Sequence, residues 1–324
     1  MALVTLDQIF DARQRIENVA LRTPLLNSPW ALCGNRSLFL KPENLQVGGA
    51  FKIRGAYNRM RALTQQERVE GVIAQSSGNH GQALAHAARL LGVRALVVMP
   101  NTSAEVKIAA TRELGAKVLL VAPEEREEKT AELAKELGYI EVSAFDDPHI
   151  ISGQGTVGLE ISEDVTSLGL DVDAVLVPVS GGGLISGIGA AIKLTRPDIR
   201  VIGVEPEFAA DAQESFRTGR RVGWPAAKTG RTIADGLRIS SVGALPFQHM
   251  QAYVDDIVTV RESDIRFAVR ALAQKAHLIA EPSGAVTVAA YLSQQDALPD
   301  GRTYIAVISG GNIDPALLAD LTAH

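Results

Sequence analysis

Short runs of consecutive hydrophobic residues recur along the 324-residue chain, and each is followed by a polar or glycine-rich segment. Such runs are typical of strands buried on both faces, because half-buried strands would alternate hydrophobic and polar positions. Between them lie segments whose hydrophobic positions keep helical spacing. The alternation predicts parallel sheets covered by helices on both faces. The predicted strands lie near residues 38–41, 71–74, 95–100, 117–121, 174–179, 201–204 and 304–308.

Helical patterns begin near Thr5 and just after the 38–41 strand, and others fill the gaps between the later strands. They cover about residues 5–19, 52–63, 79–91, 125–137, 262–275 and 283–291, and further helices begin near residue 104 and after the loop at 180–184. Three of the predicted strands end in small polar, glycine-rich loops, at Ser76, Ser180 and Ser309. Ligands of doubly wound sheets bind at the carboxyl ends of the strands, so these loops are candidate parts of one site.

Length and composition narrow the class of protein. The length predicts two domains, and 46% hydrophobic with 21% charged residues is ordinary for a water-soluble protein. A net charge of −5 without a basic block argues against nucleic acid as a partner. No signal sequence and no membrane-spanning run are recognisable, and Cys33 is the sole cysteine. We therefore expect a cytoplasmic protein without an intrachain disulfide, with Cys33 buried as a small hydrophobic residue.

The segment Gly48-Gly49-Ala50-Phe51-Lys52-Ile53-Arg54-Gly55-Ala56 carries a candidate reactive lysine. Small neighbours let a planar ligand approach the backbone beside Lys52, which favours a Schiff-base lysine. The alternative is an exposed lysine that opens an amphipathic helix, which is the commoner situation for an isolated motif of this kind.

The loop Ser180-Gly181-Gly182-Gly183-Leu184 lies between a predicted strand and a helix. Its backbone N–H groups and the helix N-terminus would suit a phosphate group. Two alternatives remain open. One is a glycine turn needed only for packing. The other is a dinucleotide fingerprint with Glu205 as the ribose-binding acid, although its third glycine is displaced to Gly187.

The loop Ser76-Ser77-Gly78-Asn79-His80-Gly81-Gln82 offers two hydroxyl groups, an amide and several N–H groups ahead of a helix. Such a loop could hold a carboxylate, with Asn79 donating a hydrogen bond to a phenolate-like oxygen. A helix N-cap is the simpler interpretation, but it explains only one of the serines. His80 alone is weak support for catalysis, and the six histidines show no metal-binding spacing.

These motifs, together with Glu281-Pro282-Ser283-Gly284-Ala285 and Ser309-Gly310-Gly311-Asn312, occur in the order and spacing of a known family. The chain resembles the pyridoxal-phosphate-dependent serine/threonine dehydratases, a group that includes serine racemase and the hydroxyaspartate dehydratases. The resemblance extends from about residue 5 to 318. It implies the tryptophan synthase β-like fold (type II), with a large domain from residues 1–70 and 147–324 and a small mobile domain from 71–146. It also implies pyridoxal 5'-phosphate, a small amino-acid substrate and a homodimer.

The resemblance assigns a role to each matching position. Lys52 would form the Schiff base with the cofactor, Phe51 would lie against its ring, and Asn79 would bind the ring hydroxyl. Ser309 would face the pyridine nitrogen. The phosphate would be held by Ser180, Gly181, Gly182, Gly183 and Leu184, and the substrate carboxylate by Ser76, Gly78, Asn79 and His80.

A neutral serine opposite the pyridine nitrogen, unlike an aspartate, does not keep that nitrogen protonated. The ring then stores a carbanion weakly, which favours loss of a β-leaving group over transamination. The implied reaction is α,β-elimination from a β-hydroxy-α-amino acid, in which Lys52 removes the Cα proton and a 2-oxo acid and ammonia are released. Ser77 matches the serine that exchanges the proton on the opposite face in serine racemase, and it is equally well explained as a loop donor.

Two further features depend on the resemblance. Glu205, Ala209 and Asp211 match a divalent-cation site, and two carboxylates with a carbonyl suit Mg²⁺ or Ca²⁺. Val47-Gly48-Gly49-Ala50 departs from the usual Lys-Thr-Gly-Ser, so activation by ATP is not expected. Ala50 and Arg126 are similar to residues of some hydroxyaspartate dehydratases, where an arginine could bind a distal carboxylate. An arginine among glutamates is more often a solvated charge.

Several functions therefore compete. The preferred one is a dehydratase acting on threonine, serine or 3-hydroxyaspartate. An amino-acid racemase such as serine racemase and a β-replacement synthase share the fold. A non-catalytic protein that binds a nucleotide or cofactor is the alternative of a different class, and it would leave Lys52 without a chemical role.

Overall fold

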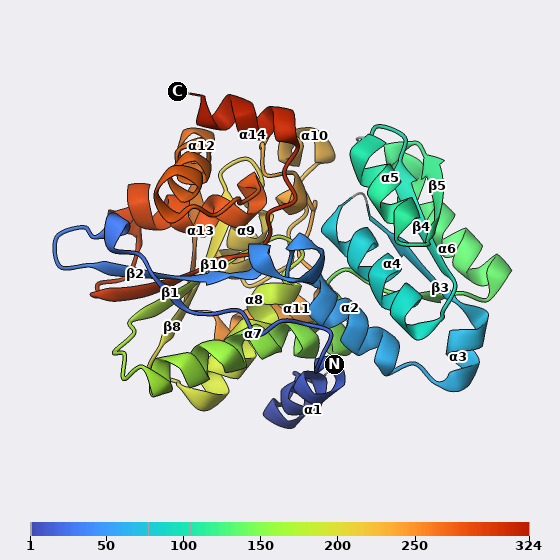
Figure 1. Ribbon diagram of the computed structural model, residues 1–324, viewed down its shortest axis with the longest axis horizontal. Coiled ribbons are helices and arrows are strands. Elements are labelled where there is room, and N and C mark those ends of the chain that lie inside the picture. Colours follow the sequence, from blue (N-terminus) through green and yellow to red (C-terminus); the bar gives the residue numbers. More distant parts are fainter. Residues whose placement is uncertain (1, 77, 104, 324) are drawn as a thin grey trace.

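The computed structural model of the chain describes residues 2–76, 78–103 and 105–323, and it contains two β-sheets. Figure 1 shows them in separate lobes, the larger sheet toward the left and the smaller toward the right. The larger sheet has the order β1-β2-β10-β7-β8-β9, and all its strands are parallel except β1, which is antiparallel to β2. Its strands are β1 (Leu26–Asn27), β2 (Ser37–Pro42), β7 (Ala174–Pro178), β8 (Arg200–Pro206), β9 (Asp256–Val260) and β10 (Thr303–Ile308).

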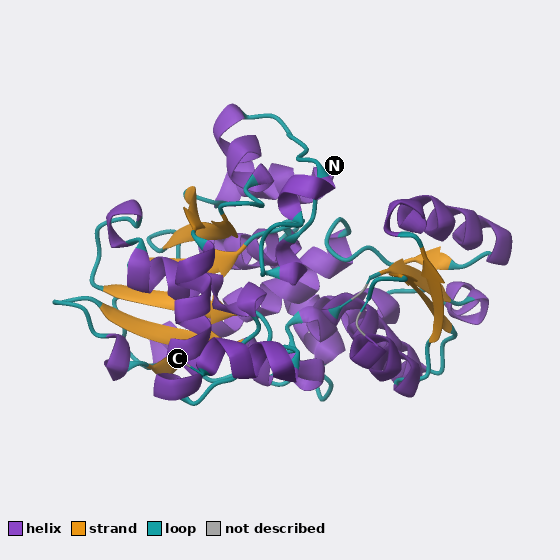
Figure 2. Cartoon of the chain, turned by 90° about the horizontal axis from the view of Figure 1, so that it is seen from above, coloured by secondary structure: helices purple, strands orange, loops and turns teal. Residues whose placement is uncertain are grey.

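The smaller sheet is parallel throughout, in the order β5-β4-β3-β6. Helices surround both sheets, as the view from above in Figure 2 makes clear. The predicted α/β class with two mostly parallel sheets is therefore confirmed. Its strands are β3 (Val72–Gln75), β4 (Ala95–Pro100), β5 (Lys117–Val121) and β6 (Ile140–Glu141).

Most of the predicted helices are present, with boundaries that move by a few residues. The hydrophobic pattern did not predict α3, α7, α9, α10, α11 or α14. The predicted helix over 262–275 ends earlier and continues as a π-helical turn over Leu272–Ala276. The helices are α1 (Leu6–Ile16), α2 (Lys52–Arg61), α3 (Gln65–Glu70), α4 (Asn79–Leu91), α5 (Glu105–Glu113), α6 (Arg126–Leu137), α7 (Pro148–Ser167), α8 (Gly183–Thr195), α9 (Asp211–Thr218), α10 (Ala226–Thr229), α11 (Ala244–Tyr253), α12 (Glu262–Ala271), α13 (Pro282–Ser293) and α14 (Pro315–Thr322).

The larger sheet is buried on both faces because successive side chains of each strand point to opposite sides. In β7, Leu176 belongs to a hydrophobic cluster with residues of α12 and α13, whereas Val175 and Val177 belong to a cluster with residues of α7 and α8. Each fully buried aliphatic side chain contributes about 1.5–3 kcal/mol. The strands have continuous hydrophobic runs in the sequence because both of their faces are buried.

Helix α2, which carries Lys52, connects the two lobes. Its residues Ile53 and Met60 belong to the same hydrophobic cluster as Val72 and Val97 of the smaller sheet, while the helix also packs against α7 of the larger lobe. The domain boundaries at residues 70/71 and 146/147 remain a prediction, and the core of the smaller lobe also includes part of α2.

Cys33 is exposed, so the prediction that it is buried is wrong. It lies in a tight turn in which Cys33 and Arg36 exchange backbone hydrogen bonds ahead of β2, and this turn holds the side chain at the surface. Among the described residues, no helix is both long enough and hydrophobic enough to cross a membrane.

Candidate active site

Two loops that are far apart in the sequence meet beside Lys52. Strands β2 and β10 are parallel neighbours, so the segments that follow them leave the same edge of the sheet. The N–H of Phe51 donates to the carbonyl of Ser309 (3.1 Å), and the N–H of Gly311 donates to the carbonyl of Gly49 (2.9 Å). Lys52 and Ser309 are therefore brought together, as the sequence predicted.

Lys52 is the first residue of α2 and is not a solvated surface lysine. Its Nζ donates to the carbonyl of Ala144 (2.8 Å) and lies 5.0 Å from the centre of the Phe51 ring. Burial lowers the pKa of Lys52 to about 8, although the nearby Glu281 carboxylate partly opposes this shift. A lysine with this pKa is substantially uncharged at mildly alkaline pH and is a competent nucleophile.

Asn79, the first residue of α4, is fixed from both sides. Its Nδ2 donates to Oε1 of Glu281 (2.7 Å), and its Oδ1 accepts from Nδ2 of Asn312 (2.8 Å). These contacts determine the orientation of the amide, and they leave the second hydrogen on Nδ2 available to a ligand. Gly310 permits this arrangement, because a Cβ there would lie 2.3 Å from Glu281 Oε1.

Glu281 is a site residue that the sequence patterns left without a role. It is almost completely buried, and burial together with the charge of Asp235 raises the pKa of Glu281 to about 7, while Asn79, Lys107 and Lys52 act in the opposite direction. Its motif was recognisable, but its contact with Asn79 joins residues 202 positions apart and could not be seen in the pattern.

The glycine-rich loop leads from β7 into α8, which begins at Gly183. Gly182 has φ = 89°, a left-handed conformation that favours glycine. The first N–H groups of a helix have no partner within it, so they remain free for an anion. The Oγ of Ser180 is buried without a hydrogen-bond partner among the described residues. These features suit a phosphate group.

Phe145 connects the glycine-rich loop to Lys52. Its ring packs on Gly181, where a Cβ would lie 2.3 Å from the ring, and its backbone follows the Ala144 carbonyl that accepts from Lys52. Close packing therefore explains part of the glycine content of this loop. The packing alternative and the phosphate interpretation are compatible, because packing uses the side-chain positions and an anion would use the N–H groups.

In the loop after β3, Ser76 acts locally as a cap. Its Oγ accepts from the N–H of Gly78 (3.3 Å) and of Gly81 (3.0 Å). His80 is buried, its Nε2 contacts the carbonyl of Val142 (2.9 Å), and burial lowers its pKa to about 3. His80 is thus neutral, and its side chain is directed at the backbone of Val142. The other ring nitrogen, Nδ1, has no hydrogen-bond partner among the described residues.

Ser309 is buried at the end of β10, and its Oγ is 3.5 Å from the carbonyl of Ser283. Ser77, the predicted second proton-exchanging residue, lies outside the described residues.

The predicted metal ligands lie together after β8. Glu205 and Asp211 are both buried. Glu205 accepts from the N–H groups of Ala212 (3.2 Å) and Gln213 (2.7 Å), whereas both carboxylate oxygens of Asp211 lack a partner among the described residues. Burial and the charge of Asp211 raise the pKa of Glu205, and burial raises the pKa of Asp211 to about 7. Burial disfavours the charged form of both carboxyl groups, and the like charge of Asp211 adds to this effect at Glu205.

Arg126 begins α6 in the smaller lobe. Its Nε is buried and makes no hydrogen bond to any described residue, and burial lowers the pKa of its guanidinium. No described contact connects Arg126 to Lys52 or Asn79.

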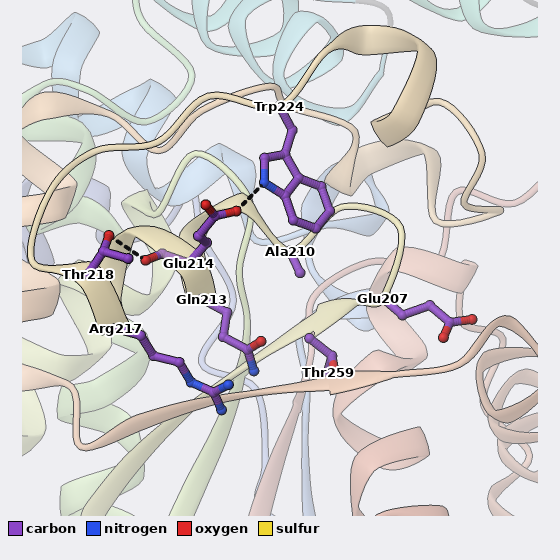
Figure 3. Close-up of a pocket in the computed structure, with 8 residues that line it drawn as sticks. All are labelled: Glu207, Ala210, Gln213, Glu214, Arg217, Thr218, Trp224 and Thr259. Atoms are coloured by element: carbon purple, nitrogen blue, oxygen red, sulfur yellow. Dashed lines mark hydrogen bonds between the residues drawn. The ribbon is translucent and has the colours of Figure 1, made fainter.

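A pocket of about 430 Å³ lies beside α9, between Trp224 and β9. Figure 3 shows Glu207, Gln213, Glu214 and Arg217 around it, with the indole N–H of Trp224 donating to Glu214 (2.6 Å). None of the residues that line it is a predicted site residue. It is a surface feature separate from the groups around Lys52.

Comparison with known proteins now settles the family. The family described as "Pyridoxal-phosphate dependent enzyme" matches residues 16–310. The chain belongs to this family. The match covers both lobes and the loops around Lys52, Asn79, Gly181 and Ser309.

Individual relatives agree. The chain is 42% identical over 318 residues to the L-threonine ammonia-lyase of Thermotoga maritima, covering 96% of this chain and 76% of the relative. Among solved structures, it is similar to a threonine deaminase from the organism abbreviated T.th., with a TM-score of 0.90, 42% identity and 96% and 99% of the two chains covered. It is also similar to maize serine racemase, with a TM-score of 0.92, 34% identity and 98% and 97% covered.

These comparisons confirm the predicted family, the type II fold, pyridoxal phosphate as the cofactor and the lyase class. The dinucleotide alternative has no support among them.

Proposed function

We propose that this family member is an ammonia-lyase that eliminates water from L-threonine, and secondarily from L-serine, to give a 2-oxo acid and ammonia. The observation that carries the proposal is the set of groups around Lys52: a partly buried amine with a pKa lowered to about 8, an oriented amide and an anion-binding loop. The two relatives named for threonine share 42% identity with the chain.

The described residues fit the cofactor. The partnerless Oγ of Ser180 and the free N–H groups at the start of α8 would hold its phosphate. The free hydrogen of Asn79 Nδ2 would reach its ring hydroxyl, and Phe51 and Ser309 would border the ring. When bound, pyridoxal phosphate supplies the electron sink for the negative charge that develops at the substrate Cα.

The chain's own groups would carry the proton and orient the substrate. Lys52, with a pKa of about 8, would accept the Cα proton and later return a proton, because its pKa is close to the working pH. The substrate carboxylate would be held by the loop at Ser76–His80, through the backbone N–H groups at the start of α4. The neutral hydroxyl of Ser309 would leave the pyridine nitrogen without a proton, which favours elimination over transamination.

The test is a product assay with the purified enzyme and L- and D-threonine, L- and D-serine, and 3-hydroxyaspartate. We expect 2-oxobutanoate and ammonia from L-threonine as the main products. Formation of D-serine from L-serine faster than 2-oxo acid would instead make the protein a racemase, the function in the name of the maize neighbour. A new amino acid formed after addition of a thiol would make it a β-replacement synthase.

The substrate range beyond threonine depends on Arg126. We propose that its guanidinium, whose Nε has no partner among the described residues, reaches the distal carboxylate of 3-hydroxyaspartate. In that case Arg126→Ala lowers kcat/KM for 3-hydroxyaspartate by about tenfold or more and leaves that for threonine within about twofold. An unchanged substrate ranking would remove Arg126 from the site.

We further propose that Mg²⁺ or Ca²⁺ binds Glu205, the carbonyl of Ala209 and Asp211. The partnerless carboxylate of Asp211 fits this ion. A cation at about 100 times its Kd stabilises a protein by about 2.7 kcal/mol, so adding either ion should raise Tm, and EDTA should lower it. Asp211→Asn should abolish this response. Equal Tm values with and without the ions would exclude the site. A homodimer and a cytoplasmic location remain predictions.

A further inference from the structure

Among the described residues, two sets of polar contacts join helices α4 and α5 of the small lobe to the large lobe close to the site. The first is the contact of Asn79 with Glu281 and Asn312, described above. The second is an ion pair between Lys107 of α5 and Asp235 of a short 3-10 turn, Asp235–Leu237, in the large lobe. Figure 1 shows α5 at the side of the small lobe that faces the large one. The first set belongs to the binding machinery, but the second has no role in the chemistry proposed above.

The ion pair is short and partly shielded. Lys107 Nζ is 2.5 Å from Asp235 Oδ2, and the two side chains are 23% and 40% exposed. On the small-lobe side, α5 packs against α4, the helix that begins with Asn79. A movement of Lys107 toward or away from the large lobe is therefore expected to move α4 as well.

On the large-lobe side, Asp235 is tied to the wall of the site. The N–H of the next residue, Gly236, donates to Oγ of Ser283 (2.9 Å), and the carbonyl of Ser283 lies 3.5 Å from Oγ of Ser309. The ion pair thus connects the helix layer that carries Asn79 to the segment that carries Ser309. These are the two sides between which the substrate and cofactor would lie.

We propose that Lys107 and Asp235 form a latch between the lobes, which holds the small domain closed over bound substrate and thereby lowers KM. They are positioning residues and make no contact with the reacting atoms. The kinetic part of this inference depends on the proposed function, whereas the closure itself does not.

The charges around Glu281 make it possible to distinguish a latch from a direct effect of the two side chains on the pKa of Glu281. Lys107 lowers the pKa of Glu281 and Asp235 raises it, alongside the contributions of Lys52 and Asn79. Neutralising Lys107 and neutralising Asp235 would therefore shift the pKa of Glu281 in opposite directions. A latch requires both partners, so the two substitutions should impair closure in the same direction.

The experiment compares Lys107→Met, Asp235→Asn and the charge-exchanged pair Lys107→Asp with Asp235→Lys, all as the pyridoxal-phosphate-loaded enzyme. Partly exposed ion pairs change an equilibrium by about two- to fivefold. On that scale, we expect both single variants to raise KM for L-threonine by about two- to fivefold with kcat changed less than about twofold, and the exchanged pair to recover at least about half of the loss.

Lys193→Met is the matched control. Lys193 pairs with Asp255 inside the large lobe (2.8 Å), and these side chains are 18% and 34% exposed, close to the values of the latch. This variant should leave KM within about twofold of wild type. KM shifts of opposite sign for Lys107→Met and Asp235→Asn, or no recovery in the exchanged pair, would overturn the latch.

Hydrogen exchange measures closure without turnover. Backbone amides of residues 79–91 and 105–113 should exchange faster in both single variants than in wild type, and as slowly as wild type in Lys193→Met. Unchanged exchange in the single variants would overturn the inference even if KM rose. If wild type does not turn over threonine, the proposed function fails while this measurement still decides the latch.

Discussion

Lys52 and Arg54 are two residues apart on the same helix, and their surroundings are opposite. Arg54 is almost completely buried and donates to Glu43 and Glu160, the latter at 2.6 Å. Burial alone would lower the pKa of Arg54, but the two carboxylates outweigh it and raise the pKa. Lys52 has a carbonyl as its hydrogen-bond acceptor, and burial prevails there. Arg54 therefore stays charged, whereas Lys52 can lose its proton near pH 8.

The difference shows how one helix can serve both stability and chemistry. Glu43 and Glu160 come from the 3-10 turn Glu43–Leu45 and from α7, so the Arg54 cluster fixes α2 against both. The same cluster extends to Lys41, whose Nζ contacts Glu160 (2.8 Å). A firmly anchored helix start allows Lys52 to remain partly buried without a carboxylate as its hydrogen-bond partner.

The largest effect should come from removing the reactive amine. Lys52→Ala should lower kcat for L-threonine by more than about 10³-fold, because the group that carries the proton is lost. The cofactor's visible absorption band should shift or disappear in the same variant. Lys129→Met, an exposed substitution on α6, is the control and should keep full activity. Activity within about tenfold of wild type in Lys52→Ala would remove the basis of the mechanism.

Arg54→Met should instead destabilise the fold. Removing one partner of a buried ion pair leaves the carboxylates uncompensated and costs about 3–5 kcal/mol. Urea unfolding of the cofactor-free protein should show this loss as a lower midpoint. Arg266→Met, which breaks an exposed pair with Asp320, should change the free energy of unfolding by less than about 1 kcal/mol. Equal losses in the two variants would contradict the comparison.

The pH dependence of stability should reveal the Lys52 amine directly. Its pKa falls from 10.5 when exposed to about 8 in the folded chain, so the unfolded chain binds more protons between these values. The cofactor-free protein should therefore gain stability as the pH rises from about 8 to 10.5. Lys52→Met should lack this gain when the two pH series of urea unfolding are subtracted. A flat difference between the series would show that Lys52 is not desolvated.

The smallest effect should be a shift in the pH dependence of the rate at which the protein binds pyridoxal phosphate. The aldehyde of pyridoxal phosphate reacts with a neutral amine, so the rate of binding should rise with pH and level off above the pKa of Lys52. Glu281 raises that pKa, and Glu281→Gln should move the rate profile to lower pH by less than about one unit. Stopped-flow absorbance measures the rate of cofactor binding at each pH. A shift to higher pH would contradict the assigned charge interaction.

Strand positions and the three loops could be read from the sequence because burial on both faces leaves a continuous hydrophobic run. Helix α7 could not, since its glycines and polar residues resemble a loop. Those residues are small because α7 lies against α2, where a Cβ at Gly153 would approach the Cα of Gly55 to 2.6 Å. The need for small residues in α7 comes from the backbone of α2 packed against it. It therefore leaves no hydrophobic periodicity in the sequence of α7 itself.

In the candidate active site, too, some features could be predicted from local sequence motifs and others could not. Lys52, Asn79 and Ser309 could be proposed from the sequence because each lies in a motif that follows a predicted strand. The partners that define their behaviour, Ala144 and Glu281, are distant in the sequence and were not assigned. Pair contacts across the fold set pKa values, and a single sequence does not reveal such pairs.

The pairing of β2 with β10 also bears on biosynthesis. The strand Ser37–Pro42 leaves the ribosome well before its parallel neighbour Thr303–Ile308, which lies far along the chain. Until that neighbour is inserted, the larger sheet lacks its middle, and the backbone of Phe51 has no Ser309 to anchor it. A nascent chain is thus expected to bind its cofactor only after Thr303–Ile308 has been synthesised and has paired with β2.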